Sequence, residues 1–97
     1  MYQCQMSDCN YVCGDVSQIN FHHIVPKSMG GSDHKSNLIE LCPNCHARIY
    51  VEGMTHGTHA VKNKNSIILL GKLLSTGGFV LEYRHIDDEE LNYCLLK

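Results

Sequence analysis

Six cysteines in a chain of 97 residues are the feature that most limits how this protein can fold. Cys42 and Cys45 are separated by two residues, a spacing that suits two ligands of one tetrahedral zinc ion. Cys4 and Cys9 are favoured as the other two ligands, although Cys13 could replace either of them. A domain this small buries a modest core, so a structural metal is an expected source of its stability.

Disulfides are the alternative interpretation of these cysteines, and the spacing favours zinc over them. Cys94 stands apart and is expected to be a free thiol. The N-terminus has neither the basic start nor the apolar run of a signal peptide. The longest strongly apolar run, residues 67–70, is too short to span a bilayer. We therefore expect a zinc-binding protein of a reducing cytoplasm, without a membrane partner.

The first half of the chain is expected to form two strands and a helix. Residues 19–25 are rich in β-branched and aromatic side chains and predict a strand. The glycine-containing stretch 27–36 predicts a loop, and residues 37–41 a second short strand. Pro43 suits the first turn of a helix, which is expected to continue until Gly53 ends it.

The second half is expected to form mainly strands. Residues 66–75 and 79–85 predict a β-hairpin, because Gly77-Gly78 between them is a strong turn signal. In the second of these strands, apolar and polar side chains alternate as in a half-buried strand. Residues 91–96 predict a third strand, and residues 54–65 are expected to be irregular.

The sequence contains no internal repeat or linker, so we expect one α+β domain over residues 1–97. Its core is placed at about residues 4–52, and a C-terminal β extension at about residues 66–97. The net charge of −2 does not favour a nucleic-acid partner. However, residues 20–84 hold seven of the eight basic residues and only four of the ten acidic ones. The middle of the chain is therefore mildly basic.

Four motifs within about residues 4–50 resemble the HNH endonuclease family in their order and spacing. They are His22-His23-Ile24-Val25-Pro26, Gly30-Gly31, Asn37-Leu38 and Leu41-Cys42-Pro43-Asn44-Cys45-His46. The resemblance implies a ββα-metal fold, in which two strands and a helix enclose one catalytic divalent ion. It also implies that the protein hydrolyses phosphodiester bonds in DNA.

The resemblance assigns a role to each polar residue of these motifs. His23 is expected to be the general base, for which the pKa of an imidazole is well suited. His22 and His46 are expected to bind the catalytic ion, which could be Mg²⁺, Mn²⁺, Ni²⁺ or Zn²⁺. Asn37 is expected to hydrogen-bond the backbone near His23 or to orient its imidazole. Some family members carry another metal-binding histidine one helical turn after the position of His46, where this chain has Tyr50.

Histidines outside the motifs have no comparable setting. His34 is expected in a loop, and His56 and His59 in the irregular segment are expected outside the site, with an approach to the site as the less favoured alternative. Since His22 and His23 are neighbours on a strand, their side chains should point to opposite faces. The two are therefore expected to reach one site through strand twist or from opposite sides of a cleft.

DNA is the expected partner, with Lys27, Lys35 and Arg48 as candidate phosphate contacts. Such contacts give affinity without sequence choice, so any specificity would come from a homodimer or a larger nuclease assembly. Two alternatives remain open for the function. One is a zinc-stapled DNA-binding module that does not cut, and the other is an accessory subunit of a larger nuclease assembly.

Overall fold

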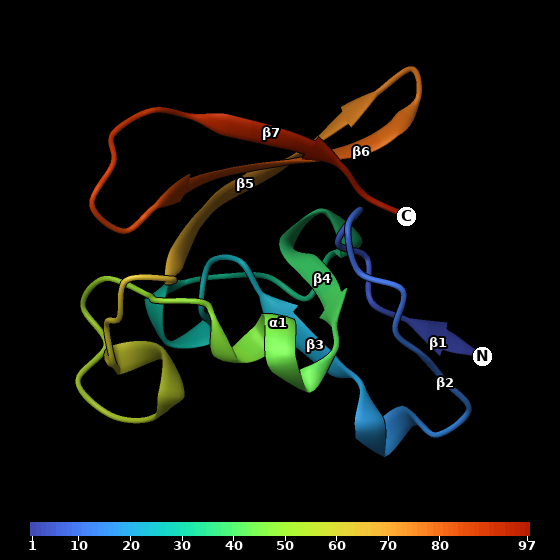
Figure 1. The fold of residues 1–97 in the computed structure, drawn as a ribbon, viewed down its shortest axis with the longest axis horizontal. Helices are drawn as coiled ribbons and strands as arrows, with labels where there is room; N and C mark the ends of the chain where they lie inside the picture. Colours follow the sequence, from blue (N-terminus) through green and yellow to red (C-terminus); the bar gives the residue numbers. More distant parts are fainter.

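A computed structural model describes residues 1–97 as three small antiparallel sheets and one short α-helix (Figure 1). The strands and helix are β1 (Tyr2–Gln3), β2 (Val12–Cys13), β3 (Asn20–His23), β4 (Leu38–Leu41), α1 (Pro43–Ala47), β5 (Ile67–Ser75), β6 (Gly78–His85) and β7 (Asn92–Leu95). Short 3-10 helices cover Val16–Gln18, Lys27–Met29, Lys35–Asn37 and Thr58–Ala60. The chain is thus a small mixed α/β protein, and none of its helices is long and apolar enough to cross a membrane.

The β3–β4 hairpin carries the histidine pair. His22 lies opposite Ile39, and His23 lies opposite Leu38. Residues that face each other across two strands project to the same side, so His22 and Ile39 are both buried against the rest of the protein. His23 projects to the other side of the hairpin, as expected for neighbours on a strand.

The helix is shorter than the sequence predicts. Cys42 caps it, since its Sγ accepts a hydrogen bond from the Cys45 amide, and Pro43 occupies the first turn. The prediction that the helix continues to Gly53 is wrong, because α1 ends at Ala47. After that point Ile49 forms a parallel bridge with Ile67, in keeping with the preference of β-branched residues for extended backbone.

The C-terminal extension is a three-stranded sheet in the order β5-β6-β7. The predicted β5–β6 hairpin is present. The predicted third strand is also present, and it pairs with β6. The register of β5 against β6 shifts between Leu69 and Gly71, which marks a bulge. Figure 1 shows this sheet on one side of the unit formed by β3, β4 and α1.

The core joins the two halves of the chain. It comprises Cys4, Met6, Ile24, Ile39, Leu41, Cys42, Ile49, Ile67, Leu81 and Leu96. Two of these ten residues are cysteines of the predicted zinc site, so the metal-binding segment is part of the packed interior. The Nζ of Lys72 on β5 also donates to the carbonyls of Lys35 and Leu38, at 2.9 and 2.8 Å, which fastens the sheet to the end of the loop before β4.

Candidate metal centre and active site

Four thiols from two distant segments meet at the start of α1. Cys4 and Cys9 come from the segment between β1 and β2, and Cys42 and Cys45 from the N-terminus of the helix. Their Sγ atoms all lie within 4.8 Å of one another, and those of Cys9 and Cys42 are 3.8 Å apart. Four sulfurs about 2.3 Å from a tetrahedral zinc ion are about 3.8 Å apart from one another. The cluster therefore suits a structural metal such as zinc.

The ionisation of the four cysteines depends on their burial and on one another. All four cysteines are free thiols rather than disulfides. Burial raises the pKa of Cys4 and of Cys45. Burial also opposes ionisation of Cys42, but the Cys45 amide and the neighbouring thiols together lower its pKa. Four thiolates this close would repel one another, so we expect all four cysteines to ionise only when a cation lies between them.

The other two cysteines lie outside the cluster. Cys13 is buried, and its thiol donates to the Asp15 carbonyl at 3.4 Å. Cys94 is half-buried on β7. Of the ligand sets left open by the spacing, the observed arrangement is the favoured one, with Cys4 and Cys9 beside the Cys42–Cys45 pair.

Three imidazoles form a second cluster. His22 comes from β3, His46 from α1, and His59 from the 3-10 helix at Thr58–Ala60. The ring centroids are 4.4 to 5.2 Å apart, and one ring nitrogen of each residue lies within 4.8 Å of the others. From the sequence, a position of His59 at the site was the less favoured alternative, whereas the structure places it beside the two predicted metal ligands. The chain thus supplies its third imidazole 13 residues after His46, not at Tyr50.

The hydrogen bonds of the cluster leave nitrogen lone pairs turned inward. His59 Nδ1 is 2.8 Å from the Ile49 carbonyl, and since a carbonyl only accepts, this nitrogen must carry the proton. In the neutral ring, His59 Nε2 then carries no proton and has a free lone pair. This nitrogen lies 3.0 Å from His46 Nε2. His22 Nε2 is buried and has no hydrogen-bond partner. A buried polar atom without a partner is costly unless something else binds it.

The protonation state of these rings favours metal binding. Burial, together with repulsion from positive charge on His59, His46 and His23, lowers the pKa of His22 to about 4. Burial and then His59 lower the pKa of His46. Neutral imidazoles are the form that binds metal, and three of them suit a divalent transition-metal ion such as Zn²⁺ or Ni²⁺. The donor set therefore fits the divalent cation that the sequence motifs imply.

His23 lies beside this cluster without belonging to it. Its side chain is 26% exposed, and its Nε2 is 2.8 Å from Oδ1 of Asp33. The other carboxylate oxygen of Asp33 accepts from Lys27 Nζ at 3.1 Å. A surface pocket of about 400 Å³ brings the four histidines together, lined by Phe21, His22, His23, Pro26, Lys27, Ser28, His46, Met54 and His59. Thus the two neighbouring histidines of β3 reach one pocket although they lie on opposite faces of the strand.

Asn37 contacts backbone and not the imidazole of His23. Its Oδ1 accepts from the Val25 amide at 2.8 Å, and its Nδ2 donates to the carbonyls of Val25 and Ser32, at 3.0 and 2.8 Å. These three bonds fold the loop between β3 and β4 back onto the end of β3. Gly31 is required inside this fold, because a Cβ atom there would lie 1.7 Å from the Val25 carbonyl oxygen.

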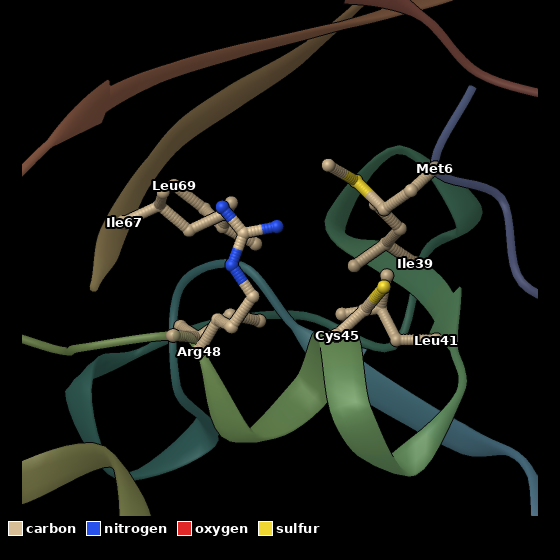
Figure 2. A pocket seen from close by; sticks show the side chains of 8 residues that line it. Met6, Ile39, Leu41, Cys45, Arg48, Ile67 and Leu69 are labelled. Atoms are coloured by element: carbon tan, nitrogen blue, oxygen red, sulfur yellow. The ribbon is translucent and has the colours of Figure 1, made fainter. Parts of the chain in front are cut away.

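The three predicted phosphate contacts lie in different places. Lys27 lines the histidine pocket. Arg48 extends from α1 towards β5, among Met6, Ile67 and Leu69 (Figure 2). It does not line the histidine pocket. Lys35 lies in another pocket, together with Leu38, Glu40 and Phe79. Only Lys27 of the three is at the histidine site.

Comparisons with known proteins match the first half of the chain. The family profile described as HNH endonuclease matches residues 4–52, just over half of the chain. Anaredoxin of Nostoc sp. is 42% identical over 50 residues, which are 50% of this chain and 58% of that protein. The type IV methyl-directed restriction enzyme EcoKMcrA of Escherichia coli is 44% identical over 32 residues, 33% of this chain and 12% of the enzyme.

The chain thus spans less than two thirds of either relative. No solved structure matches the chain. His59 lies outside the segment that the family profile matches, so local sequence similarity could not have identified it. Asp33 lies inside that segment, but no spacing rule in the sequence pointed to a carboxylate beside His23.

Proposed function

The chain belongs to the HNH endonuclease family, and from that premise we propose that it is a metal-dependent DNA endonuclease with His23 as its general base. The observation that carries the proposal is a single pocket that contains His23 and three converging imidazoles. A module that only binds DNA needs neither a proton acceptor nor buried nitrogen lone pairs. The β3–β4 hairpin and α1 would then form the ββα unit of this family.

His23 would accept a proton from the water molecule that attacks the scissile phosphorus. Its ring lies at the pocket surface, where both water and a phosphodiester can reach it. Lys27 at the pocket rim would contact a phosphate and hold the backbone in place without reading sequence. Asn37 would keep the loop after β3 folded, and in this way would fix the position of the pocket wall.

His22, His46 and His59 would hold the catalytic divalent ion. When bound, such an ion stabilises the negative charge that develops on the phosphate and on the leaving oxygen. His22 and His46 come from the family motif, and His59 comes from the following segment. The Ile49 carbonyl would orient His59 through Nδ1, as is usual for a metal-binding histidine.

The four cysteines would hold a structural zinc that fixes the start of α1. Cys45 and His46 are neighbours on this helix, so the first metal site positions a ligand of the second. We propose that residues 1–97 act as one domain on DNA. We also propose that sequence choice, if the protein has any, comes from a second copy or from a larger nuclease assembly.

A plasmid relaxation assay tests the proposal. Zinc-loaded protein is stripped of weakly bound metal, and Mg²⁺, Mn²⁺, Ni²⁺ and Zn²⁺ are then added back separately. The proposal predicts nicking with at least one ion and a loss of about 100-fold or more for His23→Ala. His56→Ala is the control for loss of a histidine outside the pocket, since His56 is exposed and does not line it. Equal nicking by the wild type and His23→Ala would refute the role of His23, and DNA binding without any nicking would favour a non-catalytic module.

A further inference from the structure

Asp33 is the only residue whose side chain makes a hydrogen bond to the imidazole of His23. We propose that Asp33 is a positioning residue, which holds the His23 ring so that Nδ1 faces the attacking water. The inference rests on the proposed role of His23 as the base. Asp33 itself would touch neither water nor DNA phosphorus and would act through His23 alone.

The geometry determines which ring nitrogen is free. His23 Nε2 is 2.8 Å from Asp33 Oδ1, and an ionised carboxylate can only accept a hydrogen bond. The hydrogen bond from His23, and then that from Lys27, hold the pKa of Asp33 below its usual range, so the carboxylate is ionised at neutral pH. His23 Nε2 therefore carries the proton, and Nδ1 is the unprotonated nitrogen with a free lone pair. This tautomer is the one that a general base at Nδ1 requires.

The fold of the loop between β3 and β4 places Asp33 next to His23. Ten residues separate the two in sequence, and the intervening chain is folded back by hydrogen bonds near both of its ends. The Gly31 amide donates to the Pro26 carbonyl at 3.0 Å, and Asn37 Nδ2 donates to the Ser32 carbonyl at 2.8 Å. Ser32 precedes Asp33 directly, so Asn37 fixes the backbone that presents the carboxylate.

Charge argues against a role of Asp33 in holding DNA. Its side chain is 67% exposed at the edge of a pocket proposed to receive a phosphodiester, where a carboxylate repels the substrate. Lys27 offsets this charge through its 3.1 Å contact with the second carboxylate oxygen. Removal of the carboxylate should therefore leave DNA affinity unchanged or slightly higher, while the rate of cleavage falls.

The proton inventory of the step is simple. One O–H bond of water breaks and its proton moves to His23 Nδ1, while the water oxygen bonds to phosphorus and the bond from phosphorus to the leaving oxygen breaks. The ring is then an imidazolium, with protons on both nitrogens. The Asp33 carboxylate stabilises this cation through the same hydrogen bond and does not take the proton itself.

The kinetic test separates positioning from binding. Single-turnover cleavage at saturating protein is measured for Asp33→Ala and Asp33→Asn, beside Asp87→Ala as the control for loss of one exposed carboxylate. We expect Asp33→Ala to cleave about tenfold more slowly, well short of the effect of removing the base itself. Asp33→Asn should regain part of the rate, because its amide oxygen can still accept from Nε2–H although it lacks the negative charge that stabilises the imidazolium. The DNA dissociation constant should not rise in either variant.

A spectroscopic readout keeps the inference testable apart from activity. In the wild type, the His23 Nε2 proton should be visible by nuclear magnetic resonance and protected from exchange with water, and in Asp87→Ala it should remain so. In Asp33→Ala it should be lost through exchange. An unchanged rate or an unchanged Nε2 proton in Asp33→Ala would overturn the inference. Equal cleavage by the wild type and His23→Ala would instead overturn the proposed function, which the resonance measurement does not use.

Discussion

Removal of one cysteine of the cluster should cost far more stability than removal of a cysteine outside it. Cys42 is 3% exposed, lies in the core and caps α1, whereas Cys94 is half-buried on β7 and outside the cluster. Both can be replaced by serine, which is similar in size. The comparison therefore contrasts a cysteine of the cluster with one outside it.

The expected magnitude follows from the small core. A structural zinc contributes about 10–16 kcal/mol at neutral pH, and domains of this size are stable by only about 5–15 kcal/mol. Complete removal of the metal should therefore unfold the protein. Loss of one ligand, as in Cys42→Ser, should cost about 3–5 kcal/mol. At about 4–8 °C per kcal/mol, the melting temperature should fall by at least about 12 °C.

Thermal melts followed by circular dichroism, together with metal analysis by mass spectrometry, provide the assay. We expect the folded wild type and Cys94→Ser to retain tightly bound zinc and to melt within a few degrees of each other. Cys42→Ser should hold the metal more weakly and melt at least about 12 °C lower, and a strong chelator should unfold the wild type. A folded wild type without tightly bound metal, or equal melting of the two variants, would refute the reasoning.

Two further perturbations test other parts of the account. Gly31→Ala should destabilise the protein strongly in urea denaturation or prevent folding, because the new Cβ would clash with the Val25 carbonyl, whereas Gly14→Ala has open space and should be nearly neutral. For His22 the folded pKa lies near 4, below the unfolded value, so the unfolded state binds more protons between these two values. The free energy of unfolding should therefore fall by at most about 3 kcal/mol as the pH decreases from about 6.5 to about 4, and this part of the slope should be absent in His22→Gln. Identical pH profiles for the wild type and His22→Gln would contradict this assignment.

Sequence reasoning located the strands well because their signals are local. Alternation of buried and exposed side chains, together with the Gly77-Gly78 turn signal, placed β5 and β6 within two residues of their observed ends. The helix was overestimated for a physical reason. The helix was expected to run on to Gly53 because no earlier stop signal stands in the sequence, but Ile49 pairs with Ile67 as extended backbone instead. No local pattern contains that contact.

The site was predictable where its residues lie in one motif and not elsewhere. Cys42, Cys45 and His46 are fixed relative to one another by a short helix, so their spacing carries the information. His59 joins the cluster only because the irregular segment after α1 folds back, and because the Ile49 carbonyl holds its ring. Asp33 likewise depends on the path of a loop. Both contacts arise from tertiary folding, which residue spacing does not encode.

Binding of a second metal ion tests most directly the claim that the histidine cluster is a metal centre. Zinc-loaded protein is titrated with Ni²⁺ or Mn²⁺ by calorimetry, beside His59→Ala and its control His56→Ala. We predict one additional ion per chain in the wild type and in His56→Ala, and at least about tenfold weaker binding in His59→Ala. No additional ion in the wild type, or equal affinity in all three proteins, would contradict the account.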